Sequence, residues 1–376
     1  MSLSVLLAVA FVGAALYYVC PLRFRWVLLL LLSYGFYLTC GVPALPFILI
    51  TTLTTWAGAL KIGRIGESGK AYLHEHKAEL TAEEKKARKA KTRSAQRIWF
   101  FAVLLLNFGV LAVLKYLNPV MAWGASLTGK NAPALGLVLP LGISFYTFQS
   151  MGYLIDVYRG TVASERSLLT FGTYLTMFPK LVSGPIASYT ELQPEFGARN
   201  VSLRQAVDGL KLFVFGMALK ILLANQLGGL WRDVTTIGFE SLSTPLAWMA
   251  AFAYSFQLYF DFWGYSLMAI GIGRMLGFHI PENFRCPYLA LSMTEFWRRW
   301  HITLGTWFRE YLYIPLGGSR CSRKRMIFNL LVVWLATGLW HGAHLNFLLW
   351  GLGLFVVLVV EKLWLKQYLD RWPVLG

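Results

Sequence analysis

One histidine of this 376-residue chain stands at the end of a long apolar run, where an ionisable side chain is costly. His341 follows Arg325 by sixteen residues without an intervening charge, which places it roughly 24 Å along a helix from that basic residue. An ionisable residue at this depth in a membrane is a candidate functional residue. A neutral imidazole there could accept a proton from an attacking hydroxyl, and burial favours the neutral form. The alternative is a structural imidazole hydrogen-bonded to a neighbouring helix.

A second group of residues combines arginine with aromatic side chains in one polar segment. Trp297, Arg298 and Arg299 lie just before His301, and Arg309 follows eight residues later. Arginine forms charge-assisted hydrogen bonds to phosphate, so these arginines could bind a phosphorylated donor. They could equally be ordinary positive residues of a cytoplasmic surface or contacts to lipid headgroups, and His301 alone could be an interfacial histidine. The residues themselves leave these alternatives open.

Among the other ionisable residues in apolar runs, only Asp261 is selected, as a candidate buried partner for an arginine. The lysines in such runs lie near span ends, where their side chains usually extend to the interface. His344 follows His341 by three residues, but no carboxylate is near in sequence, so we expect no metal site.

Composition limits the kind of protein that can position these residues. Hydrophobic residues make up 57% of the chain and charged residues only 14%, against about 45–50% and 25% in soluble domains. Too few polar residues remain to cover a water-facing surface, which excludes a soluble enzyme and a disordered protein. We therefore expect an all-α polytopic membrane protein of about nine to eleven membrane helices.

Ten apolar runs define the expected membrane segments: 3–20, 26–40, 44–60, 98–115, 135–155, 169–187, 207–229, 245–273, 326–340 and 345–360. Proline and glycine within 135–155 and 169–187 predict broken or re-entrant helices there. Thr81 and Ser292 each precede a glutamate by three residues, which predicts a capping box at the start of a helix. We expect the whole chain, 1–376, to form one membrane domain.

Charge predicts the orientation of this domain. The net charge is +17, and two polar segments carry much of it. Segment 61–97 has eleven basic and five acidic residues, and segment 281–325 has eight and three. Basic loops stay in the cytoplasm, so both segments should be cytoplasmic or half-immersed and the N-terminus extracytoplasmic. Basic and aromatic residues do not alternate along one groove, so we expect membrane lipids and not nucleic acid as partners.

Several motifs of the chain resemble those of the membrane-bound O-acyltransferase family, and most closely its bacterial alginate O-acetyltransferase branch. The resemblance extends from about residue 5 to residue 365. The motifs that carry it are Glu282-Asn-Phe-Arg-Cys-Pro-Tyr288, Thr294-Glu-Phe-Trp-Arg-Arg-Trp-His-Ile-Thr-Leu304, Trp307-Phe-Arg-Glu-Tyr-Leu-Tyr-Ile-Pro-Leu-Gly-Gly318 and Leu339-Trp-His-Gly-Ala343. Many relatives carry further apolar helices beyond the position of Trp372.

The resemblance implies transfer of an acyl group, acetyl above all, from a cytoplasmic thioester toward hydroxyls of an extracytoplasmic polysaccharide. It also implies that the membrane helices form a funnel through which this transfer takes place. His341 corresponds to the catalytic histidine of the family and His301 to a second histidine. The donor would be acetyl-CoA or an acyl-carrier protein, with no bound cofactor. An exported or membrane-anchored partner would receive the acyl group, and the chain would lie in the inner or plasma membrane.

Two other functions remain open at this stage. D-alanyl transfer to teichoic acid would use a carrier protein as donor and would need a protein-docking surface. An anion transporter or flippase would be indicated by paired half-repeats with matched broken helices, and the sequence shows no such repeat.

Overall fold

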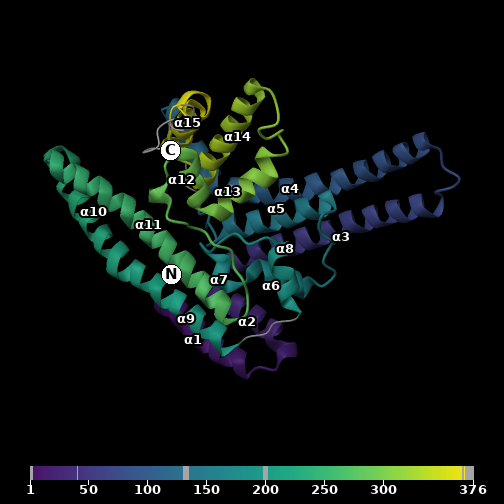
Figure 1. Ribbon diagram of the computed structural model, residues 1–376, viewed down its shortest axis with the longest axis horizontal. Coiled ribbons are helices and arrows are strands. Elements are labelled where there is room, and N and C mark those ends of the chain that lie inside the picture. Colours follow the sequence, from purple (N-terminus) through teal and green to yellow (C-terminus); the bar gives the residue numbers. More distant parts are fainter. Residues whose placement is uncertain (1–2, 40, 130–134, 198–201, 366–367, 369–376) are drawn as a thin grey trace.

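A computed structural model describes residues 3–39, 41–129, 135–197, 202–365 and 368, and its elements are helices (Figure 1). Within those ranges, β structure is limited to one isolated bridge between Phe284 and Trp300. The predicted all-α class is therefore confirmed.

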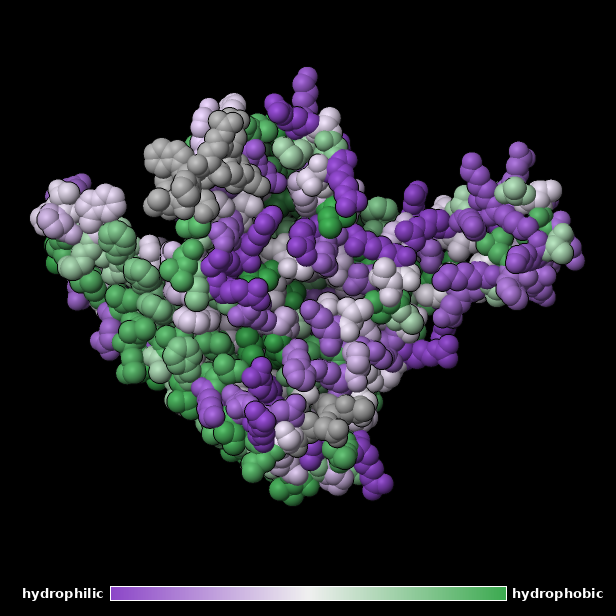
Figure 2. All heavy atoms as spheres, viewed as in Figure 1, coloured by the Kyte–Doolittle hydropathy of each residue, from purple (hydrophilic) through white to green (hydrophobic). Residues whose placement is uncertain are grey.

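The N-terminal third contains two helices that are longer than predicted and form an arm. Its elements are α1 (Leu3–Val19), η1 (Leu22–Phe24), α2 (Arg25–Leu38), η2 (Val42–Ala44), α3 (Leu45–Glu75) and α4 (Ala82–Leu127). The ends of α3 and α4 on either side of residues 76–81 extend away from the body as a hydrophilic pair (Figures 1 and 2). Segment 61–97, expected as a loop, is thus mostly helix because it is rich in alanine, lysine and glutamate. The capping box at Thr81 and Glu84 is confirmed.

The middle of the chain contains the broken helices. Its elements are α5 (Ile143–Arg159), α6 (Leu168–Thr176), α7 (Phe178–Leu181), α8 (Tyr189–Leu192) and η3 (Gln193–Phe196). Residues 169–187 are broken as predicted, since α6 ends just before Met177 and Pro179. The prediction of a helix that begins at residue 135 was wrong, because residues 135–142 are not helical and α5 begins at Ile143. Gly142 has φ +76°, and a Cβ there would collide with the carbonyl oxygen of Leu181.

Two long helices pack closely through glycines in the next part of the chain. Its elements are α9 (Leu203–Ala218), the π-helical turn η4 (Leu219–Ala224), α10 (Asn225–Ile237), η5 (Phe239–Ser241) and α11 (Thr244–Met275). A Cβ added to Gly209 would lie 2.6 Å from the carbonyl oxygen of Gly271, and one on Gly216 would lie 2.5 Å from that of Gly264. Small residues that let backbones approach in this way are typical of membrane helix interfaces.

The C-terminal part places short helices beside two longer ones. Its elements are η6 (Pro287–Leu289), α12 (Met293–Arg299), α13 (Ile302–Phe308), the π-helical turn η7 (Arg309–Tyr313), α14 (Arg323–His341), α15 (Leu345–Val360) and η8 (Glu361–Leu365). The expected spans 326–340 and 345–360 thus correspond to α14 and α15. Helix α14 is unbroken from Arg323 to His341, as the depth assigned to His341 requires.

The surface fits a membrane environment. Three described stretches are long and apolar enough to cross a bilayer, namely Val42–Glu75, Ala82–Leu127 and Leu345–Leu365. The outer side of α10 and α11 is also apolar (Figure 2). Trp248 and Phe252 of α11 are 64% and 59% exposed, and Leu222 of the adjoining turn η4 is 65% exposed, which water would disfavour and lipid would not. The chain is an all-α membrane protein; the number of crossings stays a prediction.

Segments predicted to be cytoplasmic contact one another. The arm donates a hydrogen bond from Arg93 to the carbonyl oxygen of Tyr158. The next residue, Arg159, donates from Nη2 to the carbonyl oxygen of Glu310 at 3.0 Å. At the end of α1, the Tyr17 hydroxyl donates to the carbonyl oxygen of Leu276 at 2.9 Å. Segments 61–97 and 281–325 are thus linked through residues 158 and 159, and their orientation in the membrane stays a prediction.

Candidate functional site

A cavity of about 520 Å³ lies among α12, α13, α14 and the C-terminal turn η8. Four of the residues selected from sequence line it together: Trp297, Arg298, His301 and Arg309. Both arginines are exposed, whereas His301 is only 4% exposed. The cavity thus has two exposed positive side chains at its open side and a buried histidine at its enclosed side.

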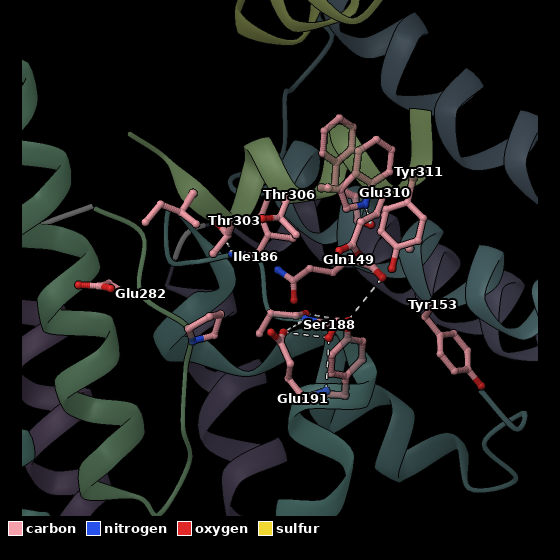
Figure 3. Close-up of a pocket in the computed structure, with 17 residues that line it drawn as sticks. Gln149, Tyr153, Ile186, Ser188, Glu191, Glu282, Thr303, Thr306, Glu310 and Tyr311 are labelled. Carbon is pink, nitrogen blue, oxygen red and sulfur yellow. Dashed lines mark hydrogen bonds between the residues drawn. The ribbon is translucent and has the colours of Figure 1, made fainter. Parts of the chain in front are cut away.

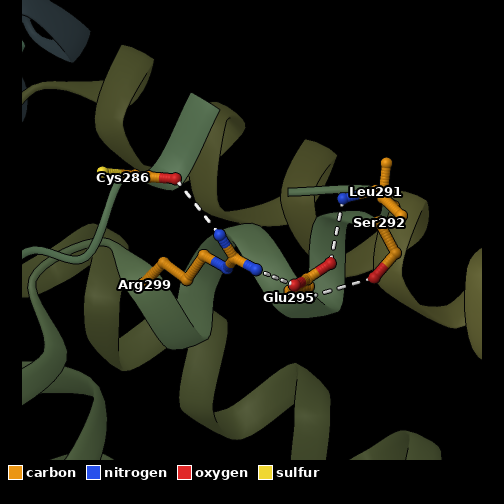
Figure 4. Close-up of polar contacts among 5 residues, drawn as sticks. All are labelled: Cys286, Leu291, Ser292, Glu295 and Arg299. Atoms are coloured by element: carbon orange, nitrogen blue, oxygen red, sulfur yellow. Dashed lines mark hydrogen bonds and ion pairs between the residues drawn. The ribbon is translucent and has the colours of Figure 1, made fainter. Parts of the chain in front are cut away.

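Helix α12 is anchored at its N-terminus by two acidic side chains. Glu361 of η8 accepts hydrogen bonds from the backbone N–H groups of Met293 (2.5 Å) and Thr294 (3.0 Å). Ser292 caps the helix by accepting from the N–H of Glu295 at 3.1 Å. The reciprocal half of the predicted capping box is not formed, because the Glu295 carboxylate accepts from the N–H of Leu291 (Figure 4). Negative charge at the N-terminus of a helix interacts favourably with the positive end of the helix dipole. The two hydrogen bonds to Glu361 also fix α12 against η8.

Arg299 lies outside the cavity that Arg298 and Arg309 line. Its guanidinium pairs with the Glu295 carboxylate and donates to the carbonyl oxygen of Cys286 at 3.5 Å (Figure 4). Arg309 also forms an ion pair, with Glu310 at 3.3 Å, but its side chain is 61% exposed against 30% for Arg299. A donor contact of Arg299 stays a prediction.

His301 lies between α12 and α13 in a left-handed backbone conformation, with φ +45°. Its Nδ1 is 3.0 Å from the Oδ1 of Asn283. Within the described chain its Nε2 is buried without a hydrogen-bond partner. Aromatic rings surround it, with the centroids of Phe262 and Phe145 at 4.7 and 6.4 Å. A histidine this enclosed, with one nitrogen bound and one bare, is suited to receiving a single ligand.

His341 ends α14 on the other side of Trp340. The Trp340 ring centroid lies 4.7 Å from that of His341 and 6.0 Å from that of His301. Trp350 also contacts His341, at 4.9 Å. In the isolated chain His341 is exposed and does not line the cavity. Both histidines therefore lie next to the indole of Trp340; His301 is enclosed and His341 is accessible.

Two further polar residues of the site were not selected from sequence. Lys115 of α4 donates from Nζ to the carbonyl oxygen of Trp340, and Asn283 holds His301. The place of Lys115 in an apolar run is the signal for such a contact, although lysines near span ends usually extend to the interface. Asp261 does form an ion pair, but with Lys220 of η4 and not with an arginine, and its side chain is 44% exposed.

A second cavity, of about 210 Å³, lies on the other side of α13, and Ile302 and Thr306 line both cavities. The side chain of Gln149 is directed into it (Figure 3). Gln149 is 2% exposed, and its Oε1 accepts a hydrogen bond from the fully buried Lys180 of α7. The broken segment after α6 thus supports α13 from behind. Across the described ranges there is no group of three or more histidine, cysteine or carboxylate side chains suited to a metal ion.

Comparison with known proteins agrees with this architecture. The family model of the membrane-bound O-acyltransferases matches residues 161–373. A probable alginate O-acetylase of Azotobacter vinelandii is 38% identical over 352 residues, which are 92% of this chain and 65% of that protein. A peptidoglycan O-acetyltransferase of Helicobacter pylori is 34% identical, over 74% of this chain and 58% of that protein. A teichoic acid D-alanyltransferase of Streptococcus thermophilus is 29% identical, over 60% of this chain and 58% of that protein.

The chain spans less than two thirds of the length of each of these three relatives. The family match nonetheless covers more than half of the chain and includes both histidines and the arginines of the cavity. The chain belongs to the membrane-bound O-acyltransferase family.

Proposed function

We propose that this chain forms the membrane core of an O-acyltransferase that moves an acetyl group from a cytoplasmic thioester toward hydroxyls of an extracytoplasmic polysaccharide. The observation that carries the proposal is the 520 Å³ cavity, which holds Arg298, Arg309, Trp297 and His301, with His341 one indole away. The names of the relatives, which refer to alginate and peptidoglycan, support an envelope polysaccharide as the final acceptor.

The exposed arginines suit the phosphates of acetyl-CoA. Arg298 and Arg309 lie on the lining of the cavity, where guanidinium groups can bind phosphate oxygens in pairs. The interior beyond them is apolar and aromatic, with Leu304, Phe308 and Trp334 among its residues, and suits the uncharged thioester arm. In this arrangement the charged end of the donor stays at the cytoplasmic opening and the acyl group reaches the histidines.

In the proposed reaction His341 acts as general base. It takes the proton of the acceptor hydroxyl as that oxygen attacks the thioester carbonyl carbon. A C–O bond forms, the C–S bond breaks, and the His341 imidazolium gives its proton to the departing thiolate, which leaves as a free thiol. Because His341 is exposed and His301 is enclosed, an acceptor can approach His341 from outside the donor cavity. The acceptor on this chain would be an exported or membrane-anchored partner that passes the acetyl group to the polysaccharide.

Relatives that transfer D-alanine to teichoic acid favour a second candidate, in which the donor is a carrier protein. The two candidates differ in what must occupy the cavity opening. Acetyl-CoA needs the two arginines for its phosphates, whereas a carrier protein would bind over a wider surface.

Purified chain in detergent would be incubated with radiolabelled acetyl-CoA or with a D-alanylated carrier protein, each with and without membrane extract as a source of partner. Release of free thiol and transfer of label from acetyl-CoA would support the proposal. Transfer only from the carrier protein would move the assignment to D-alanylation. Binding of neither donor, in protein shown to be folded and monodisperse, would reject both.

A further inference from the structure

We infer that Asn283 is a positioning residue that fixes the ring proton of His301 on Nδ1, so that the bare Nε2 is the nitrogen through which His301 accepts a hydrogen bond in the donor cavity. The inference rests on the proposed acyl transfer for its role in turnover. The position of the proton can be measured without any activity, so the two can fail separately.

The orientation of the Asn283 amide follows from its neighbours. The backbone N–H of Thr303 can only donate, and it points at one terminal atom of Asn283 at 3.3 Å, so that atom must be the oxygen. The Thr303 hydroxyl accepts from the N–H of Ile186 at 3.0 Å and donates to the same oxygen at 2.9 Å. The other end of the amide donates to the Ser266 hydroxyl at 3.1 Å. Exchange of the amide oxygen and nitrogen would set the Thr303 N–H against an NH₂ group, whereas the hydroxyls of Thr303 and Ser266 could accept or donate in either orientation.

The tautomer of His301 then follows from that oxygen. Since Oδ1 of Asn283 cannot donate, the Nδ1 that lies 3.0 Å from it must carry the hydrogen. In a neutral imidazole the second nitrogen is then unprotonated and has a free lone pair. That second nitrogen, Nε2, is buried and unpartnered within the described chain, and His301 lines the donor cavity. This nitrogen can therefore accept a hydrogen bond from a molecule that enters the cavity.

The backbone keeps Asn283 and His301 in register. The N–H of Ile302 donates to the carbonyl oxygen of Asn283 at 2.9 Å, and the N–H of Arg285 donates to that of Arg299 at 2.9 Å. These bonds surround the isolated bridge between Phe284 and Trp300. Asn283 is 1% exposed, so water does not compete for its oxygen. The short pairing of two chain segments therefore determines the state of the ring.

The charged and titratable groups around His301 are few. His341 of α14 is close enough to act on it electrostatically, and the same cavity is lined by Arg298 of α12, Arg309 and Tyr313 of η7, and Lys362 of η8. The rings packed on it from α5 and α11, Phe145 and Phe262, are uncharged. A negative charge placed at Asn283 would thus be the nearest anion to the ring.

The test compares Asn283→Asp and Asn283→Leu with Asn107→Leu, a control at an equally buried asparagine of α4. Nitrogen-15 NMR of histidine-labelled protein reports the tautomer, and His301→Gln identifies the signal among six histidines. We expect Nδ1–H in the parent and in Asn283→Asp, because a carboxylate still accepts from Nδ1, and loss of this preference in Asn283→Leu.

Activity supplies the second readout. Asn283→Leu should lower kcat at least about 10-fold with the donor KM little changed, since a ring in the wrong tautomer cannot accept a hydrogen bond through Nε2. Asn283→Asp should retain activity but shift the acid limb of its pH profile to higher pH, because the carboxylate stabilises the imidazolium. Asn107→Leu should change neither the tautomer nor that limb.

An Nε2–H signal in the parent protein would overturn the inference, as would Asn283→Leu with an unchanged tautomer and kcat. If Asn283→Leu does not fold, the parent spectrum and the pH profile of Asn283→Asp still decide. A correct tautomer in a chain that transfers no acyl group would reject the proposed function and leave the positioning by Asn283 intact.

Discussion

The two histidines of this chain occupy different environments, and this difference suggests a division of labour. His301 has a fixed hydrogen-bond partner and an enclosed position in the donor cavity. His341 is accessible and contacts the indole rings of Trp340 and Trp350. A residue that meets an incoming acceptor must be reachable, whereas one that contacts the donor must be aligned with it. The accessible histidine is accordingly the stronger choice for general base.

His341→Gln should leave the fold and donor binding almost intact while lowering turnover by about two to four orders of magnitude, because glutamine cannot accept a proton at neutral pH. Thiol release per folded molecule measures this effect. His344→Gln is the matched control, since His344 is also exposed and three residues away. Near-normal turnover in His341→Gln would show that the histidine is structural.

The three arginines should separate into two classes. Arg298→Gln and Arg309→Gln should weaken acetyl-CoA binding by about 1.5–3 kcal/mol each, the usual contribution of a charge-assisted hydrogen bond. Arg299→Gln should instead lower thermal stability and leave donor affinity unchanged, because its partner is Glu295. Calorimetric titration with acetyl-CoA and a melting curve for each variant distinguish the classes. Equal donor binding in all three variants would favour a lipid-facing role for the cavity arginines.

At the residue scale the sequence predicted which types of side chain form the site and less about their partners. His301, Trp297, Arg298 and Arg309 do line one cavity. Asn283 was not found, because its role depends on pairing with a segment eighteen residues away and on amide orientation. The partner of Arg299 likewise depends on how α12 begins.

At the element scale, the glycines of α9 and α11 hold the body of the molecule together. Gly216→Ala should destabilise the protein, since its Cβ would lie 2.5 Å from the carbonyl oxygen of Gly264 and the two helices would have to separate. Gly229→Ala on α10 has open space at its Cβ and should be neutral or slightly stabilising. Unfolding in a denaturing detergent series measures both. Equal stability of the two variants would contradict the close packing.

Helix starts and breaks were predicted well where a side chain determines them locally. The capping box at Thr81 and the break before Pro179 are in the structure. Helix lengths were predicted less well, because hydropathy locates the membrane and not the end of a helix. Helix α4 extends well beyond its apolar run, since alanine, lysine and glutamate continue a helix in water.

At the scale of the whole molecule, basic segments far apart in sequence are joined on one side. The contact of Arg93 with Tyr158 and that of Arg159 with Glu310 connect the arm to the region of the donor cavity. If both basic segments face the cytoplasm, a donor from that side would meet basic residues on elements that contact one another. This arrangement depends on a shared orientation for the arm and for segment 281–325.

Lys77→Cys and Arg323→Cys, each in a chain whose four native cysteines are replaced by serine, should resist an impermeant thiol reagent in intact cells. Both become reactive once the membrane is opened, because both positions are exposed and basic loops remain in the cytoplasm. Thr128→Cys, at the opposite end of α4, should react in intact cells and serves as the control. Labelling of either basic position from outside would invert the topology.

The backbone at His301 has a consequence for protein engineering. His301 and Cys286 are the two described non-glycine residues with positive φ, at +45° and +44°. A left-handed conformation costs an L-residue roughly 1–2 kcal/mol relative to glycine. Selection of this chain for heat resistance would thus favour glycine at the exposed Cys286. Glycine at His301 would instead remove a buried ring and its hydrogen bond to Asn283, which costs more than the backbone gains. A thermostabilisation campaign would therefore leave the left-handed histidine of the cavity in place.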